Sequence, residues 1–227
     1  MGKRSYQIDV LRIFKDGKQR AKDEIIHEEE VVVKLNGETH SFYCIPADLE
    51  EMIIGNLVSR GIDVSSLSLK KTGDTELEAI IPPTTTSPTR CDSRKTLTKN
   101  EIFHLVERLE ENSFLYRKTG CTHVIGLCEG GREIFVEDIS RHCALDKVIG
   151  RAIKQGMDLT NSALISSCRQ TASTMRKAAY CRIPIVISIA APTDLARAEA
   201  QEYGITLVGF ASSERFTVYC HEWRIEV

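Results

Sequence analysis

The sequence has few aromatic residues, no long apolar run and almost no net charge. Aromatic residues make up 6% of its 227 residues, and the formal net charge is −2. The longest apolar stretch, 183–192, is too short for a bilayer, which needs about 20 residues. No polybasic segment and no export-signal pattern occurs near the N-terminus. We therefore expect a cytoplasmic protein that binds neither membrane nor nucleic acid.

Familiar signatures of metal and nucleotide sites are also missing. No two of the eight cysteines form a C-x-x-C pair, so zinc-ribbon and thioredoxin-type sites have no support. A deaminase-type zinc site needs H-x-E and P-C-x-x-C, and neither occurs. There is no P-loop and no G-x-G-x-x-G. The sequence predicts no zinc site and no standard nucleotide-binding loop.

Residues 1–96 predict a small β-rich domain with one helix. Strands at 30–35 and 39–45 flank an Asn-Gly pair, which is a strong hairpin signal. A helix is expected between 46 and 61, followed by a second hairpin formed by strands at 67–71 and 76–81. Residues 82–96 are rich in proline, serine and threonine, and we interpret them as an interdomain loop.

Residues 97–227 predict an α/β domain. Thr98 and Glu101 form a capping box before a helix. A hairpin at 123–136 and a helix from about 141 to 156 follow. Strands then alternate with helices up to 210, the first of these helices being expected at 169–179, and a final strand covers 216–220. This alternation implies parallel strands joined by right-handed crossovers. The expected fold class is α/β (α+β), with the smaller β-rich domain followed by a three-layer αβα domain around a mixed sheet.

Polar residues gather where the predicted parallel strands end, at the edge where such sheets bind ligands. The loops concerned are 137–142, 167–169, 191–194 and 211–215. They bring together Arg141, Arg169, Arg215, several hydroxyl groups and helix N-termini, a combination that suits a phosphate-bearing ligand.

Structural roles are the alternative for several of these residues. Ser140, Ser167 and Thr193 are placed to cap helices, and the arginines could simply be solvated. His123 begins an apolar strand, where a hydrogen-bonded structural histidine is common. His142 is not accompanied by a G-x-S-x-G elbow. Both interpretations stay open at this point.

One segment carries a family resemblance. Residues 137–150 read E-D-I-S-R-H-C-A-L-D-K-V-I-G. They resemble the E-D-[VI]-G-R-H-N-A-[VL]-D-K-[LV]-I-G signature of FdhD, the formate dehydrogenase accessory sulfurtransferase. Shorter segments similar to this family follow in the expected order: P-A-D-L-E at 46–50, T-G-C-T-H at 119–123, A-P-T-D-L at 191–195, G-F at 209–210 and R-F-T-V-Y-C-H at 215–221.

The resemblance implies a function that composition alone does not. Members of the family take persulfide sulfur from a cysteine desulfurase and pass it to the molybdenum (or tungsten) bis-guanine-dinucleotide cofactor, needed for formate dehydrogenase activity. The second domain is expected to be cytidine-deaminase-like without its zinc, and the protein to be a homodimer. GDP is expected to act as a binding mimic. The implied partners are the desulfurase and the formate dehydrogenase catalytic subunit.

The resemblance also implies which residues bind the cofactor. The family's F-x-R-x-x-R segment falls on 210–215, where Ser212 replaces the first arginine. The family's S-G-R turn falls on 167–169. The expected cofactor-binding residues are His123, Asp138, Arg141, His142, Ser167, Arg169, Thr193, Phe210, Ala211, Ser212, Ser213, Glu214 and Arg215.

The sulfur-carrying loop departs from the family pattern. The family has R-S-x-C-G-x-C-G, and this chain has T-R-C-D-S-R with the single Cys91. Arg90 and Arg94 favour a thiolate at Cys91, whereas Asp92 opposes it. One thiol suffices for a persulfide relay, so Cys91 is the expected catalytic sulfur carrier. The alternative is a cofactor-binding chaperone or regulator that has lost sulfur transfer.

Three further cysteines stand near the predicted crevice. Cys121 and Cys168 replace family glycines, and Cys143 replaces a family asparagine. They either substitute for the missing loop cysteine or reflect changes in packing. The other four lie in or beside apolar runs and are expected to be buried: Cys44, Cys128, Cys181 and Cys220.

Overall fold

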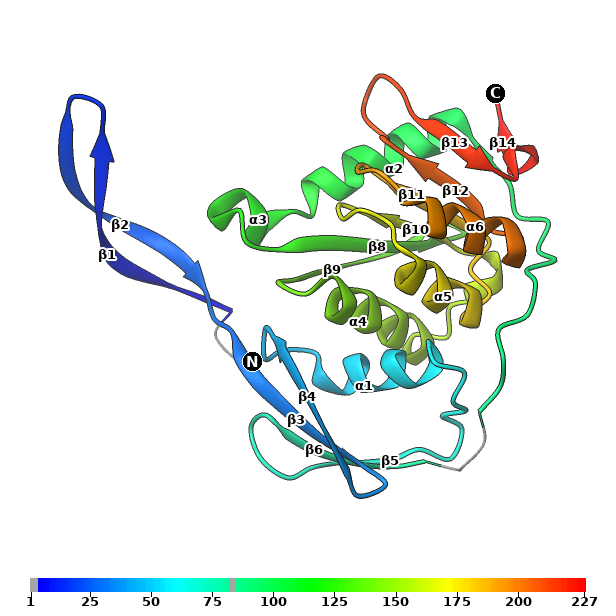
Figure 1. The fold of residues 1–227 in the computed structure, drawn as a ribbon, viewed down its shortest axis with the longest axis horizontal. Coiled ribbons are helices and arrows are strands. Elements are labelled where there is room, and N and C mark those ends of the chain that lie inside the picture. Colours follow the sequence, from blue (N-terminus) through cyan, green and yellow to red (C-terminus); the bar gives the residue numbers. More distant parts are fainter. Residues whose placement is uncertain (1–3, 82–84) are drawn as a thin grey trace.

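The N-terminal part of the chain is a four-stranded sheet covered by one helix. The computed structural model describes residues 4–81 and 85–227 (Figure 1). The sheet has the order β4-β3-β6-β5, from β3 (Glu29–Leu35), β4 (Glu38–Cys44), β5 (Ser68–Lys71) and β6 (Glu76–Ile80). Helix α1 (Leu49–Val58) packs on its apolar face. The predicted hairpins and helix are confirmed, and residues 82–84 of the predicted loop lie outside the described residues.

A long hairpin precedes this sheet and was not predicted. Strands β1 (Ser5–Phe14) and β2 (Gly17–Ile26) pair antiparallel along their full length. The hairpin projects away from the body of the molecule as an arm (Figure 1). Leu11, Ile13 and Phe14 near its tip each expose more than half of their surface. The arm has no core of its own, and its sequence accordingly mixes charged with apolar residues.

The C-terminal part is built on a six-stranded mixed sheet. Its strands are β8 (His123–Glu129), β9 (Arg132–Asp138), β10 (Ala163–Ser166), β11 (Ile185–Ser188), β12 (Thr206–Gly209) and β13 (Thr217–Cys220), in the order β13-β12-β11-β10-β8-β9. β10, β11 and β12 run parallel, and the other pairings are antiparallel. The central strands are buried on both faces, which explains their continuous apolar sequences.

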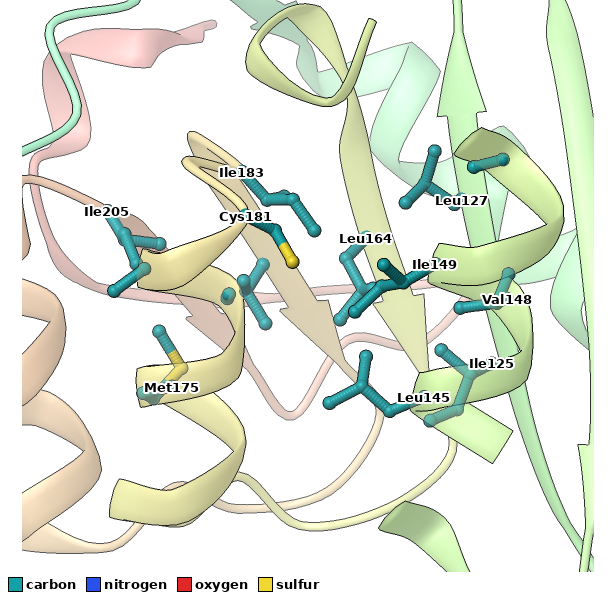
Figure 2. Close-up of a cluster of buried hydrophobic side chains, with 14 of the residues drawn as sticks. Ile125, Leu127, Leu145, Val148, Ile149, Leu164, Met175, Cys181, Ile183 and Ile205 are labelled. Atoms are coloured by element: carbon teal, nitrogen blue, oxygen red, sulfur yellow. The ribbon is translucent and has the colours of Figure 1, made fainter. Parts of the chain in front are cut away.

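Helices cover both faces of this sheet. One face carries α4 (Arg141–Lys154), α5 (Ala172–Tyr180) and α6 (Asp194–Tyr203). In Figure 2, apolar side chains of α4 and α5 meet those of the strands beneath them. The other face carries α2 (Lys99–Glu111), and the short α3 (Phe114–Thr119) follows it. The predicted three-layer α/β architecture with a mixed sheet is confirmed.

Capping explains where the helices begin. Thr98 Oγ1 accepts the backbone N–H of Glu101, whose carboxylate accepts that of Thr98 at 2.7 Å, as the capping box predicts. The helix predicted at 169–179 begins instead at Ala172, because Thr171 and Thr174 cap it. Arg169 therefore lies in the preceding loop. Within the described ranges, no helix is long and apolar enough to cross a membrane.

The two parts of the molecule meet closely along α1 and α4. A Cβ atom added to Gly55 would lie 1.8 Å from the Asp146 carbonyl oxygen, and one added to Gly150 equally close to that of Glu51. Larger residues at either glycine would force the helices apart. The buried Lys147 ammonium also donates to the Ile45 carbonyl at 2.7 Å. The division of the chain at residue 96 stays a prediction.

Candidate functional site

The predicted loops do meet at one edge of the six-stranded sheet. β10, β11 and β12 end there, whereas the antiparallel β8 begins there and β9 ends there. Backbone hydrogen bonds join neighbouring loops: Gln170 N–H to Ala191, Thr193 N–H to Gln170, and Phe210 N–H to Ala190. We call this region, formed by residues 138–142, 167–170, 190–193 and 210–215 with His123, the carboxyl-edge site.

A cationic cluster occupies the β8 side of the carboxyl-edge site. Arg141, the first residue of α4, and Arg169, after β10, both lie near His123. Burial, followed by these two positive charges, lowers the pKa of the half-buried His123 below its ordinary value. The imidazole is therefore neutral near pH 7. Guanidinium groups are donors that suit an anionic ligand.

Two buried polar atoms of the carboxyl-edge site have no partner. Within residues 4–81 and 85–227, Arg141 Nε and Gln170 Oε1 are the buried side-chain nitrogen and oxygen atoms without a hydrogen bond. Gln170 is 1% exposed, and its amide N–H₂ donates to the Cys168 carbonyl at 3.1 Å. Buried polar groups are normally paired, so these atoms identify a region where polar contacts are incomplete. Sequence patterns gave no signal for Gln170, because a lone loop glutamine belongs to no motif.

A cavity of about 610 Å³ adjoins the cationic cluster. It lies beside the ends of α2 and α3 and reaches His123 and Ser167 at the carboxyl edge. Its other lining residues include Leu109, Tyr116, Arg117, Cys121, Thr122 and Ile189. This volume falls in the usual range for small-molecule sites, and its lining is mainly apolar with a few polar groups. Residues 109–120 were not among the predicted site residues, because α3 was not predicted.

Phe210 forms the β12 side of the carboxyl-edge site. It has φ +50°, a left-handed conformation that is strained for a bulky residue, and the residue is 46% exposed. Ala211, next along, is buried. The turn that follows is closed by Ser212, whose Oγ accepts the N–H groups of Glu214 and Arg215. Ser213, Glu214 and Arg215 are exposed on that turn.

Several predicted site residues have structural partners. Ser140 and Thr193 cap α4 and α6, as the capping alternative predicts. Ser167 does not cap a helix, because its Oγ accepts the Val124 N–H at 2.9 Å and ties β10 to β8. Asp138 is fully buried and pairs with Lys147 at 2.5 Å.

His142 faces a different environment from His123. It is half-buried on the first turn of α4, and burial, followed by the charges of Lys177 and Arg141, lowers its pKa. Lys177 itself pairs with the buried Asp146. Lys177 of α5 is therefore near His142, and Arg141 is near both His142 and His123.

Cys91 lies at the opposite edge of the sheet. Its backbone N–H donates to the Tyr203 carbonyl, just before β12, and its thiol donates to the Arg182 carbonyl, just before β11. The residue is 5% exposed. Arg224 donates to the Ser93 and Gly204 carbonyls and so fixes the adjoining loop. The structure therefore does not bring Cys91 together with the predicted cofactor-binding residues.

The remaining cysteines are free thiols in different environments. Cys121 is exposed on the wall of the cavity. Cys168 is buried at the carboxyl-edge site, where burial raises its pKa and its sulfur lies 2.8 Å from Ser166 Oγ. Of the four thiols predicted to be buried, Cys44, Cys181 and Cys220 are, and Cys128 is only partly so.

Comparisons with known proteins identify the family of this chain. Residues 68–226 match the model of the FdhD/NarQ family. The sulfur carrier protein FdhD of Wolinella succinogenes is 32% identical over 240 residues, covering 90% of this chain and 83% of that protein. The same-named protein of Methanothermobacter thermautotrophicus is 29% identical over 243 residues, covering 96% and 98%.

A solved structure gives the same result for the fold. A Desulfotalea psychrophila protein assigned as a formate dehydrogenase accessory protein superposes with a TM-score of 0.89 at 26% identity. The match covers 98% of this chain and all of that one. By sequence and by fold, the chain belongs to the FdhD/NarQ family.

Proposed function

We propose that this chain is a formate dehydrogenase accessory protein that carries sulfur and binds the molybdenum (or tungsten) bis-guanine-dinucleotide cofactor as its substrate. The names of the relatives support the accessory and sulfur-carrying roles. The observation that carries the cofactor assignment is the carboxyl-edge site, where Arg141 and Arg169 lie near His123 and an exposed, strained Phe210 lies on the β12 side of the same edge.

The residues present fit a guanine dinucleotide. Its diphosphate suits the two guanidinium groups, and the unpaired Arg141 Nε would gain a partner. Its guanine suits the exposed Phe210, because aromatic rings stack on bases. GDP carries both features, so it is the appropriate small probe.

Sulfur carriage through Cys91 requires the loop that contains Cys91 to move. A cysteine desulfurase transfers sulfur by direct attack of an acceptor thiolate on its persulfide, so the acceptor must be exposed. Cys91 is held in its buried position by the hydrogen bond from its backbone N–H to the Tyr203 carbonyl. The hydrogen bond from Arg224 to the Ser93 carbonyl holds the same loop. We propose that release of this loop exposes Cys91 for sulfur loading.

The burial of Cys91 also favours a second candidate function. A chain that keeps the carboxyl-edge site but cannot load sulfur would act as a cofactor-binding chaperone or regulator. The two functions share the cofactor and differ only in whether a thiol accepts sulfur.

Persulfide mapping separates the two functions. The protein is incubated with a cysteine desulfurase and cysteine, and its intact mass and peptides are then measured. A reducible gain of about 32 Da per sulfur on the Cys91 peptide, absent in Cys91→Ser, is expected for a sulfur carrier. The same gain on Cys121 or Cys168 would instead place the sulfur site at the cavity wall or at the carboxyl-edge site. No gain, with GDP still bound, would establish the chaperone alternative.

The family resemblance also leads to proposals about localisation, oligomeric state, partners and the second domain. We propose a cytoplasmic homodimer whose partners are a cysteine desulfurase and the formate dehydrogenase catalytic subunit, with a deaminase-like domain at 97–227. The exposed apolar residues of the arm support self-association. Light scattering of the intact protein tests it, and a monomer at micromolar concentration would contradict it.

A further inference from the structure

The β1–β2 arm is a two-stranded sheet without a third strand. Within residues 4–81 and 85–227, β1 and β2 pair only with each other, so both outer edges of the arm are open. An isolated two-stranded hairpin is only marginally stable in water, and open strand edges readily pair with another chain. Leu11, Ile13 and Phe14 also expose apolar surface near the end of the arm. The arm therefore has the properties of an element that a partner covers.

The charges of the arm are divided between its two ends. The tip, residues 11–22, contains five basic residues and one acidic residue, a formal charge of +4. The root, residues 23–30, contains five acidic residues and no lysine or arginine, a formal charge of −5. Two antiparallel arms would place each tip against a root of opposite sign, which is a complementary arrangement.

Several of these charges have no partner in their own chain. Lys18 and Arg20 at the tip and Glu28 and Glu30 at the root are exposed. The ion pairs of the arm and its root involve other residues of the described chain: Arg12 with Asp23, His27 with Glu29, and Lys118 with Glu24. The four exposed groups are thus free to pair with a second molecule.

A hollow of about 320 Å³ lies at the root of the arm. Its lining combines apolar side chains with a carboxylate: Ile26, Glu28, Tyr43, Cys121, Ile139 and Ser140. Tyr43 is 59% exposed there. This root hollow suits the apolar and basic side chains of an arm tip. The tip of the same arm does not reach it, because strands of ten residues place that tip about 30 Å away.

We infer that two copies of this chain exchange arms, with the tip of each arm packed at the root of the other and against its root hollow. A two-fold axis makes the contact isologous, so both tips are covered at once. The same axis sets the arms antiparallel, which allows their open strand edges to pair. A tip-to-tip contact would instead bring two groups of charge +4 together.

Arm exchange brings residues of one copy to the carboxyl-edge site of the other. Ser140 lines the root hollow and caps α4, whose first residue is Arg141. Lys18 and Arg20 of the second copy then add positive charge beside the site proposed for a phosphate-bearing cofactor. This consequence rests on the proposed function, whereas arm exchange itself requires only a second copy of the chain.

Cross-linking between copies tests the exchange directly. Gln19→Cys introduces a thiol on the exposed tip, and the native Cys121 is an exposed thiol in the root hollow. Gln19 lies roughly 23 Å before Ile26 along β2, so a short bismaleimide joins position 19 to Cys121 only between copies. We expect a product of twice 25.5 kDa with that linkage, and none in Gln19→Cys/Cys121→Ser. A product that joins position 19 of both copies, or no cross-linked product, would overturn arm exchange.

Charge reversal makes the test specific to the contact between tip and root. Lys18→Glu/Arg20→Glu and Glu28→Lys/Glu30→Lys should each weaken self-association by about tenfold or more, because like charges then meet. Mixing the two variants should restore the dimer, since every tip then faces a root of opposite sign. Sedimentation velocity provides the measurement. Lys34→Glu/Lys70→Glu, at exposed lysines of the four-stranded sheet, is the matched control and should behave as the parent does.

The outcomes separate arm exchange from the proposed homodimer. Undiminished dimers of both charge-reversed variants would overturn arm exchange and leave a homodimer formed through another surface. A parent protein that is monomeric at micromolar concentration would overturn both. Neither measurement involves the cofactor, so the proposed cofactor binding is tested separately.

Titration of GDP into the dimer tests the contribution to the carboxyl-edge site. Lys18→Gln/Arg20→Gln should weaken GDP binding by about threefold or more, because two exposed cations of the second copy are lost. Lys34→Gln/Lys70→Gln should leave GDP binding unchanged. Equal GDP affinity in both variants would overturn this contribution.

Discussion

Cys91 and Arg141 lie at opposite edges of the six-stranded sheet. Cys91 is hydrogen-bonded to residues that precede β11 and β12, whereas Arg141 begins α4 beside the carboxyl ends of the parallel strands. Parallel strands of four residues separate these edges by about 13 Å. In the proposed function, sulfur loading at Cys91 and cofactor binding at Arg141 would therefore use different surfaces, so variants at one edge should leave the other intact.

Replacing Arg224 should expose Cys91. The buried Arg224 guanidinium donates to Ser93, Gly204 and Thr206, and these contacts keep the loop closed. In Arg224→Met, we expect iodoacetamide to alkylate Cys91 at least tenfold faster, because hydrogen bonds to a charged donor are worth about 1.5–3 kcal/mol each. Mass-mapped alkylation rates provide the measurement. Arg197→Met, at an exposed arginine, is the control. An unchanged alkylation rate of Cys91 in Arg224→Met would show that Arg224 does not hold the loop closed.

Substitutions of Phe210 should separate binding from stability. Phe210→Gly removes the ring and relieves the left-handed strain, so GDP affinity should fall by about tenfold or more while Tm stays equal or rises. Phe210→Ala should lose the same affinity without the gain in Tm. Calorimetric titration and thermal melts measure both. GDP binding unchanged in both variants would exclude stacking on Phe210.

GDP affinity should depend on the protonation of His123. The pKa of free His123 lies below 6.5, and a bound diphosphate would raise it by compensating the two arginines. The complex then binds more protons than the free protein, so affinity should increase as the pH falls through and below about 6.5. His123→Gln should remove this part of the pH dependence and leave only that of GDP itself. Identical pH profiles for both proteins would contradict the placement of the phosphates.

Breaking the buried ion pair should destabilise the junction between the two parts of the molecule. Lys147 and Asp138 are 1% and 0% exposed, so Lys147→Met leaves an unpaired buried carboxylate. We expect a loss of about 3–5 kcal/mol in the free energy of unfolding, measured with urea. The double variant Asp138→Asn/Lys147→Met should recover part of this loss. A double variant less stable than Lys147→Met would show that charge burial is not the cause.

Periodicity and capping chemistry predicted most of the fold. The Thr98–Glu101 box and the Asn36-Gly37 turn are local signals, and both elements occur where expected. The β1–β2 arm was missed because it buries no apolar face. Helix α3 was missed because a distant side chain caps it: Glu137 accepts the N–H groups of Leu115 and Tyr116.

The site was predicted less completely than the fold. Strand order correctly predicted that Arg141 and Arg169 would share an edge, because the ends of parallel strands meet. The burial of Cys91 depends on Arg224, 133 residues further along, and no local pattern predicts it.

Titration of GDP into paired arginine variants tests the central claim most directly. Arg141→Ala/Arg169→Ala removes the two charges at the carboxyl edge, and Arg90→Ala/Arg94→Ala removes two exposed charges beside Cys91. We predict that the first pair weakens GDP binding by at least a hundredfold, since each charge-assisted contact is worth about 1.5–3 kcal/mol. The second pair should bind GDP as the parent does. Unchanged binding in the first pair, or loss only in the second, would contradict a cofactor site at the carboxyl edge.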